Sequence, residues 1–224
     1  MIFACGFLGI SIYNLLLYYG QLTVMPGTAS LLVNTAPIFT TLLSVILLKE
    51  KVSEWGWLSL FISFTGVILI VLGQKNGIQL DTGALLILGA AITFSLYFII
   101  QKPLLLKYNG LEVTTYSIWA GTILLLPYTF TMAPKLPSAP NEILYTVTFL
   151  GIFPGAIAYY CWSVVNQHLP ASVAAPFLYL TPVFSMIFSY FIFKEVPSII
   201  TITGGIIAIT GVYATNLFKR SGIG

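Results

Sequence analysis

The chain has 224 residues, of which 58% are hydrophobic and 7% are charged, and its formal net charge is +3. A soluble domain carries about 25% charged residues, so this chain has too little polar surface to cover a globule in water. The composition excludes an ordinary soluble domain, and the small net charge, spread over scattered basic residues, gives no reason to expect a nucleic-acid partner.

Apolar runs long enough to cross a bilayer recur along the whole chain. A helix needs about 20 apolar residues to cross roughly 30 Å of hydrocarbon, whereas a barrel strand alternates apolar and polar residues over about 10. The continuous runs predict an all-α, polytopic membrane bundle of about eight transmembrane helices. We place them near Ile2–Gly20, Ala29–Leu48, Trp55–Leu72, Gly83–Ile100, Thr114–Thr131, Ile143–Val165, Ala174–Phe193 and Ile199–Phe218.

The ionisable residues lie in the loops between these runs, as the cost of a charge at mid-bilayer requires. When alternate loops are placed on alternate sides, one side holds more Lys and Arg residues than the other. Basic loops favour the cytoplasm, so the richer side is predicted to be cytoplasmic, with both chain ends on it. That side holds Lys49, Lys51, Lys102, Lys107, Lys219 and Arg220, and the other holds Lys75, Lys135 and Lys194.

The chain contains an internal repeat. Pro37 aligns with Pro182, an offset of 182 − 37 = 145 residues, and the same offset aligns Gly66 with Gly211. It also aligns the Lys-Glu pair at residues 49–50 with that at 194–195. Chance similarity between apolar segments would align Leu, Ile and Val, but not a proline, a glycine and a Lys-Glu pair without a gap. We therefore predict a duplicated unit, in which the two glycines allow close helix packing.

The repeat divides the chain unequally. Residues 1–73 form an incomplete first repeat of three helices, and residues 83–218 form a second repeat of five. An odd number of helices in the unit makes consecutive copies enter the membrane in opposite orientations. Such inverted repeats are common in secondary transporters, whose substrate sites lie near the midplane between the copies.

Two pairs of segments resemble the EamA domains of the drug/metabolite transporter superfamily. They are ASLLVNTAPIFTTLLSVILLKEKVS with ASVAAPFLYLTPVFSMIFSYFIFKEVPS, and GVILIVLG with GGIIAITGVYATNLF. The resemblance covers essentially the whole chain. It implies a ten-helix, exporter-like fold whose members move amino acids and other small metabolites, present here from its third helix onward. It does not fix a substrate.

A polar stripe on the second predicted helix contains Asn34 and Pro37, and its counterpart in the second copy contains Tyr179 and Pro182. Polar groups that face lipid without a partner cost free energy. We therefore predict that Asn34 and Tyr179 line a substrate cavity; the alternative is that they pack helices together. Each proline removes an intrahelical hydrogen bond and predicts a kink.

Two other predicted helices carry candidate cavity residues on one face each. The resemblance implies that both helices line the central cavity, whereas the alternative is an aromatic belt at the membrane interface. Asn14 and Tyr159 align at the repeat offset. The two faces are Ser11, Asn14 and Tyr18 in the first helix, and Tyr159, Trp162 and Asn166 in the sixth.

The remaining candidates are assigned by depth in the bilayer. Tyr97 lies deep in the fourth predicted helix and is a cavity candidate, as is Tyr13 beside Asn14. Gln101 and Asn166 lie near helix ends, so we favour the interfacial belt for both.

The Lys-Glu pairs Lys49-Glu50 and Lys194-Glu195 follow the two proline-containing helices directly. They are either gate salt bridges at opposite membrane faces or solvated helix ends, and we favour solvated ends.

No Asp, Glu, Lys, Arg or His lies deep inside a predicted span. A proton-coupled carrier usually uses a buried carboxylate, and a phosphate-bearing substrate calls for a Lys or Arg clamp. The sequence favours a transporter that exports a small neutral or zwitterionic metabolite across the cytoplasmic membrane by alternating access. Its expected partners are membrane lipid and the substrate, without a cofactor; homodimerisation is left open.

An intramembrane enzyme is the alternative from another functional class. Its nucleophile would need a base within hydrogen-bond reach, but the one histidine, His168, lies in a loop. Cys5 and Cys161 lie in separate apolar runs, and no metal site is predicted. A third alternative is a truncated transporter fragment that is inactive or works only with a partner.

Overall fold

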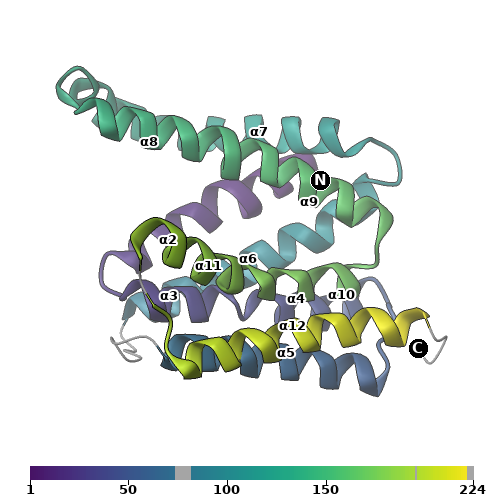
Figure 1. Ribbon diagram of the computed structural model, residues 1–224. Coiled ribbons are helices and arrows are strands. Elements are labelled where there is room, and N and C mark those ends of the chain that lie inside the picture. Colours follow the sequence, from purple (N-terminus) through teal and green to yellow (C-terminus); the bar gives the residue numbers. More distant parts are fainter. Residues whose placement is uncertain (74–81, 195, 221–224) are drawn as a thin grey trace.

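The computed structural model describes residues 1–73, 82–194 and 196–220. These residues form helices joined by short loops, arranged as a bundle in which helices far apart in sequence lie side by side (Figure 1). Glu195 and Lys75, two residues singled out in the sequence, lie outside the described residues.

Three long helical segments make up the half before residue 74. The first contains a π-helical turn and the second is interrupted at Asn34 and Thr35, while the third is continuous. The first is α1 (Ile2–Gly6), η1 (Phe7–Ile12) and α2 (Tyr13–Gln21); the second is α3 (Pro26–Val33) and α4 (Ala36–Leu47); the third is α5 (Glu54–Leu72).

Five long helical segments follow, and they repeat the irregularities of the first half. A π-helical turn lies within the third segment and a 3-10 stretch within the fourth. The segments are α6 (Thr82–Leu104); α7 (Gly110–Met132), with a 3-10 turn η2 (Ala133–Ser138); α8 (Asn141–Ile152), η3 (Phe153–Ala158) and α9 (Tyr159–His168); α10 (Ala171–Ala174), η4 (Ala175–Leu180) and α11 (Thr181–Phe193); and α12 (Ile199–Arg220).

Six of these segments are long and apolar enough to cross a membrane, and Ile199–Thr215 in α12 is a shorter apolar stretch. α7 has 23 residues but is not among the six, since Thr and Tyr residues such as Thr114, Thr115 and Tyr116 dilute its apolar run. The predicted all-α membrane bundle is confirmed. The six are Ile2–Gln21, Pro26–Leu47, Glu54–Leu72, Thr82–Leu104, Asn141–His168 and Ala171–Ile192.

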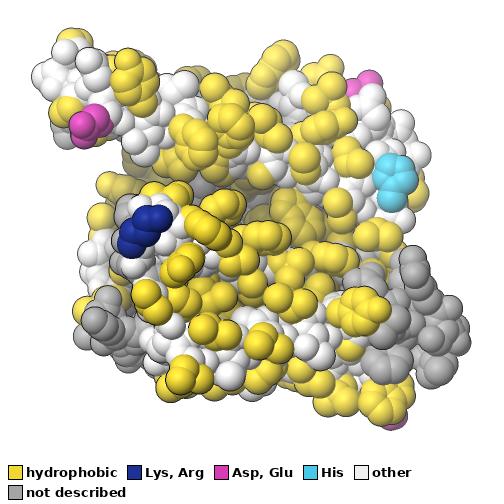
Figure 2. Space-filling model, viewed as in Figure 1, with side chains coloured by type: hydrophobic (Ala, Val, Ile, Leu, Met, Phe, Trp, Pro, Cys, Tyr) yellow, Lys and Arg dark blue, Asp and Glu magenta, His cyan; other side chains and the backbone are white. Residues whose placement is uncertain are grey.

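The exposed side chains of α8 indicate whether the bundle is surrounded by water or by lipid. None of its residues is buried, and the exposed side chains include Val147, Phe149 and Leu150. Hydrophobic side chains also cover most of the face seen in Figure 2. Water does not tolerate an apolar surface this extensive, whereas lipid does.

The two prolines that align at the repeat offset each lie just after an irregular stretch. Pro37 is the second residue of α4, and α3 ends at Val33, four residues earlier. Pro182 is the second residue of α11, which follows the 3-10 stretch η4. A proline ring clashes with the carbonyl four residues before it and offers no N–H to that carbonyl, so a regular α-helix is interrupted there.

Lys49 and Lys194, which also align at the repeat offset, share an unusual backbone. Their φ angles are 56° and 57°, and among the described residues they are the only non-glycine residues with positive φ. A left-handed residue after a helix reverses the chain and ends the helix. α4 and α11, which the 145-residue offset aligns, thus end in the same way.

Three glycines bring α5 and α12 into backbone contact. A Cβ atom added to Gly66 would lie 2.4 Å from the Ala208 backbone nitrogen, and one on Gly211 would lie 2.6 Å from the Ser63 nitrogen. Gly204 would meet the Gly66 carbonyl oxygen at 2.6 Å. Small residues allow helices to approach this closely. The predicted packing role of Gly66 and Gly211 is confirmed.

This contact predicts a position-specific cost for one methyl group. Gly66→Ala should lower the thermal stability of the detergent-purified protein, because overpacking costs about 1–3 kcal/mol. Gly151→Ala is the control, since a Cβ there meets nothing within 4 Å. Equal melting temperatures for the two variants would contradict the proposed tight contact.

Candidate substrate-binding site

Aromatic side chains from α2, α6 and α9 form a connected group. The ring centroids of Tyr13 and Phe94 lie 5.4 Å apart, and those of Phe94 and Tyr97 lie 6.3 Å apart. Tyr97 in turn lies 5.9 Å from Tyr159. All three contacts are tilted, within the range in which aromatic rings attract one another. The group therefore joins a helix of the first half to two helices of the second.

The group continues towards the end of α9. Phe94 stacks on Phe98 at 6.3 Å, and Phe98 makes an edge contact with Trp162 at 5.9 Å. We refer to Tyr13, Phe94, Tyr97, Phe98, Tyr159 and Trp162 as the aromatic group.

Asn14 and Tyr159 connect this group to the π-helical turn η1. The Tyr159 hydroxyl donates to the Gly9 carbonyl at 2.8 Å, and the Asn14 amide donates to the Ile10 carbonyl at 2.7 Å. The two acceptors are adjacent residues of the same turn, so Asn14 and Tyr159 are held close together. π-Helical turns are frequent at functional sites. Here the turn supplies the carbonyl oxygens that hold two polar side chains at the edge of the aromatic group.

Gly9 makes this arrangement possible. A Cβ atom at Gly9 would lie 2.4 Å from Cγ of Tyr97. A glycine without a side chain lets the tyrosine ring rest directly on the backbone of η1. Any larger residue at position 9 would displace Tyr97 from the group.

Next to Tyr97 and Phe98 of the aromatic group, Gln101 and Asn166 form a buried polar network. Asn166 donates to the Phe98 carbonyl at 2.8 Å and to the Gln101 amide oxygen at 3.2 Å. Gln101 donates from its nitrogen to the Tyr97 hydroxyl at 2.9 Å and to the Ser163 hydroxyl at 3.1 Å. The Phe98 carbonyl can only accept, so it determines which end of each amide faces which neighbour.

The expectation of an interfacial belt for Gln101 and Asn166 is wrong, because both side chains are fully buried. The network is the part of this region that sequence reasoning missed. A signal was present in the spacing: Gln101 follows Tyr97 by four residues and Asn166 follows Ser163 by three, so each pair lies on one helix face.

The site is open on one side. Asn14 is exposed and Tyr13, Tyr159 and Trp162 are half-buried, whereas Tyr97 is buried. Figure 2 shows the surface hollowed between the α8–α9 layer and the α11 layer. Five of the seven predicted cavity residues thus come together in one region: Tyr13, Asn14, Tyr97, Tyr159 and Trp162.

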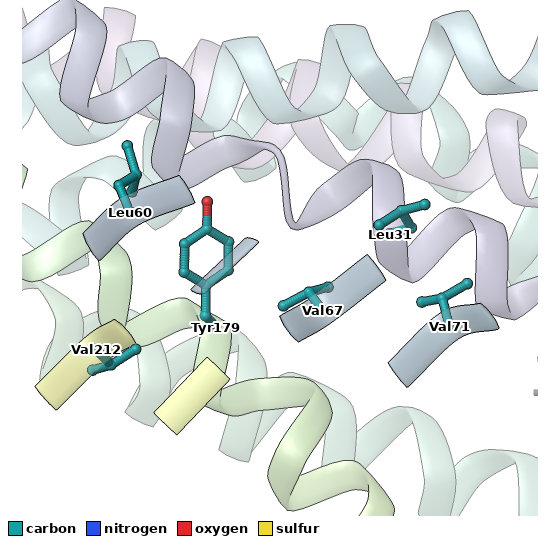
Figure 3. Close-up of a cluster of buried hydrophobic side chains, with 6 residues drawn as sticks. All are labelled: Leu31, Leu60, Val67, Val71, Tyr179 and Val212. Carbon is teal, nitrogen blue, oxygen red and sulfur yellow. The ribbon is translucent and has the colours of Figure 1, made fainter. Parts of the chain in front are cut away.

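The other two predicted cavity residues make different contacts. Asn34 is largely buried and donates within its own helix to the Ser30 carbonyl at 2.7 Å. Tyr179 is fully buried in an apolar cluster that joins α3, α5, η4 and α12, where its ring lies among aliphatic side chains (Figure 3). Among the described residues its hydroxyl has no hydrogen-bond partner. A cavity role for either residue stays a prediction.

Glu50, from the first of the two Lys-Glu pairs, contacts the second half of the chain. It is half-buried, and its carboxylate accepts hydrogen bonds from Ala171 and Ser172 of the second half. Lys49 and Lys194 are exposed at the ends of α4 and α11. Within the described ranges, no three His, Cys, Asp or Glu side chains gather as they would to hold a metal ion.

Comparison with known proteins agrees with this architecture. The family model of the EamA-like transporter family matches residues 1–72 and 81–217, nearly the whole chain. The chain belongs to this family. A solved crystal structure superposes on 98% of this EamA-like chain with a TM-score of 0.84, covering 77% of the solved chain at 19% identity. That likeness shows the fold.

Curated relatives of this EamA-like protein are also named as transporters. An uncharacterized transporter of Bacillus subtilis, YdfC, is 37% identical over 96% of this chain and 71% of its own length. A probable terminal-alkyne amino-acid exporter of Streptantibioticus cattleyicolor is 35% identical over 96% of this chain and 72% of its own. An S-adenosylmethionine uptake transporter of Rickettsia prowazekii is 30% identical over 88% of this chain and 67% of its own.

The buried network predicts an unequal effect for one substitution at two glutamines. Gln101→Leu should destabilise the protein by about 1–3 kcal/mol, because buried partners on three residues lose their hydrogen bonds. Gln21→Leu, at an exposed position at the end of α2, is the matched control and should change stability little. Thermal unfolding in one detergent measures both, and a smaller loss for Gln101→Leu than for Gln21→Leu would refute the network.

Proposed function

We propose that this chain is a secondary transporter that exports a small neutral or zwitterionic, amino-acid-like metabolite across the cytoplasmic membrane by alternating access. The aromatic group, together with Asn14, binds the substrate.

The observation that carries this proposal is that Asn14 and Tyr159, from different halves of the chain, bond to the adjacent carbonyls of Ile10 and Gly9 in η1. The two residues occupy equivalent positions at the repeat offset, and they meet where the first half contacts the second. Transporters built from repeats bind their substrates at such an interface, near the middle of the membrane. We therefore treat residues 1–73 and 83–218 as two inverted repeats, the first with three helices.

The chemistry of the group supports a neutral or zwitterionic substrate. Its side chains are Phe, Tyr and Trp, with the Asn14 amide at the edge, and none carries a formal charge. Aromatic faces attract an ammonium group through cation–π interactions, while amide and hydroxyl groups can bind a carboxylate. A zwitterion presents both charges at once, so such a lining can bind it without a buried counter-ion.

The relatives support transport of this kind without fixing its direction. The Streptantibioticus protein is named as an amino-acid exporter, whereas the Rickettsia protein is named as an uptake transporter. We assign export because amino-acid export is the function named for the more similar of these two.

Orientation follows from the distribution of basic residues, six against three. We place Glu50, the α9–α10 turn and both chain ends on the cytoplasmic side. Glu50 contacts Ala171, the first residue of the span Ala171–Ile192, and Lys194 follows the last turn of that span. Lys49 and Lys194 therefore lie at opposite ends of the bundle.

A pair of neighbouring tyrosines tests the binding site. Tyr159→Phe removes the hydroxyl that holds the π-helical turn and should slow export about tenfold, the effect of losing roughly 1.4 kcal/mol of stabilisation. Tyr160→Phe, the adjacent and exposed position, should export at the wild-type rate. Export from loaded cells is compared at equal membrane levels of protein, with a panel of amino acids. Wild-type export by Tyr159→Phe would remove the site from the proposal.

Orientation is tested by labelling. Lys49→Cys and Lys194→Cys are made separately in a variant without Cys5 and Cys161, and intact cells are treated with a membrane-impermeant thiol reagent. The Lys194→Cys protein should be labelled, and the Lys49→Cys protein should react only after the membrane is permeabilised. Labelling of both in intact cells would rule out the inverted arrangement.

A further inference from the structure

Glu50 makes a direct link between the two halves at one end of the bundle. Its carboxylate accepts from the backbone nitrogens of Ala171 at 2.9 Å and Ser172 at 3.0 Å. It also accepts from the Ser172 hydroxyl at 2.6 Å. We call this set, Glu50 with Ala171 and Ser172, the Glu50 clasp. It joins the α4–α5 loop to the start of the span Ala171–Ile192, 121 residues away along the chain.

The clasp supplies hydrogen-bond acceptors for the first N–H groups of α10. The first N–H groups of a helix have no partner within it, and the residue before α10, Pro170, has no side chain that can cap them. A carboxylate at this position forms charge-assisted hydrogen bonds and favourably meets the positive end of the helix. The cap comes from the other half of the protein, so the start of this span is fully satisfied only while the halves are together.

The backbone of the first half holds Glu50 in place. Lys49 has a left-handed conformation, and the Glu50 backbone nitrogen then returns to the Ser44 carbonyl at 3.1 Å. A left-handed residue that lets the next N–H turn back to a carbonyl in the last turn is a common way to end a helix. The end of α4 thus directs the carboxylate towards the α9–α10 turn, and the two halves are linked by a fixed geometry.

The same turn is held from its other side by Lys102. Its ammonium group donates to the carbonyls of Asn166 and Leu169, at the end of α9. Asn166 belongs to the network that contains Gln101 and supports Tyr97 of the aromatic group. A continuous set of contacts therefore runs from the aromatic group to the turn that Glu50 binds.

A cavity of about 250 Å³ lies next to the clasp. Glu50 and Ser172 form part of its wall, and the rest comes from the α4–α5 loop, Pro170 and helices of both halves, including Thr41 of α4 and Thr215 of α12. Thr41 is buried, and its hydroxyl has no partner among the described residues. This space next to the link gives Glu50 and the turn room to separate.

We propose that the Glu50 clasp is the gate that closes this end of the transporter, and that transport requires it to open and re-form. The proposal rests on the proposed function of the chain. Hydrogen bonds suit a gate. When it opens, water can replace the bonds between the half-buried carboxylate and the backbone N–H groups at little net cost in free energy. Apolar packing of the same area would close the end more permanently.

The test uses Glu50→Gln, which keeps the shape of the side chain but removes the charge and one acceptor oxygen, and Glu50→Ala, which removes the clasp. Glu54→Gln is the matched control: Glu54 is an exposed acidic residue in the first turn of α5, four positions away. Each change is combined with Thr41→Cys as a reporter in the protein without Cys5 and Cys161. The rate of modification by an impermeant maleimide is measured in inside-out vesicles without substrate.

In the Glu50→Ala protein the Thr41→Cys reporter should react about tenfold faster than with Glu50 present, because loss of charge-assisted hydrogen bonds shifts the gate towards its open state. Glu50→Gln should give an intermediate rate, and Glu54→Gln should match the parent. Unchanged labelling in both Glu50 variants would overturn the proposal. Equal acceleration by Glu54→Gln would also overturn it, because the effect would then be general loosening.

Export is measured in parallel on variants that keep Thr41. Glu50→Ala should export about tenfold more slowly than Glu54→Gln at equal membrane levels, since a gate that fails to close interrupts alternation. Wild-type export by Glu50→Ala would overturn the gate. Labelling needs no substrate, so faster labelling in a protein that exports none of the tested amino acids would support the gate and count against the proposed substrate class alone.

Discussion

The bundle is organised by one constraint: a polar group inside an apolar span must find its partner within the protein, because lipid offers none. Most hydroxyls satisfy this locally, as when Ser59 donates to the Trp55 carbonyl and Ser63 to that of Ser59. Such bonds stay within one helix and do not determine how helices dock. A few hydroxyls bond to another helix, and these bonds do determine how helices dock. Ser11 donates to the Gly121 carbonyl, and Ser95 donates to the Ala36 carbonyl.

The candidate site follows from the same constraint. Tyr159 and Asn14 meet carbonyls of the π-helical turn, and the Asn166 amide nitrogen donates to the Gln101 amide oxygen next to the aromatic rings. The helices of this region are also held by a close glycine contact, because Gly20 of α2 and Gly83 of α6 touch backbone to backbone. The polar groups that remain near the open side are therefore few and fixed in direction, which is what selective binding of a small solute needs.

Much of the fold was predictable from the sequence because the features involved are local or repeated. Apolar run length predicts the spans, Pro37 and Pro182 mark the interrupted helices, and the 145-residue offset finds positions with matching backbone, such as Lys49 and Lys194. The same offset aligns Asn14 with Tyr159, whose side chains bond to adjacent carbonyls of η1.

The site was predictable only in part, because helix periodicity gives a face but not its neighbour. Ser11 was expected to share a face with Asn14, yet Ser11 is buried and bonded to α7 while Asn14 is exposed. The π-helical turn η1 contains Ser11 and changes the angular spacing, so counting in steps of three and four fails across it. Similarly, nothing in the sequence around Gln101 or Asn166 shows that a second helix covers them. That burial is visible only in the tertiary packing.

The turn between α9 and α10 has an electrical property that follows from its contacts. It is held by one anionic side chain, Glu50, and one cationic side chain, Lys102. A charge that crosses the membrane potential gains or loses about 2.3 kcal/mol per 100 mV. A step that moves these two groups together carries no net charge, so the membrane voltage neither drives nor resists it.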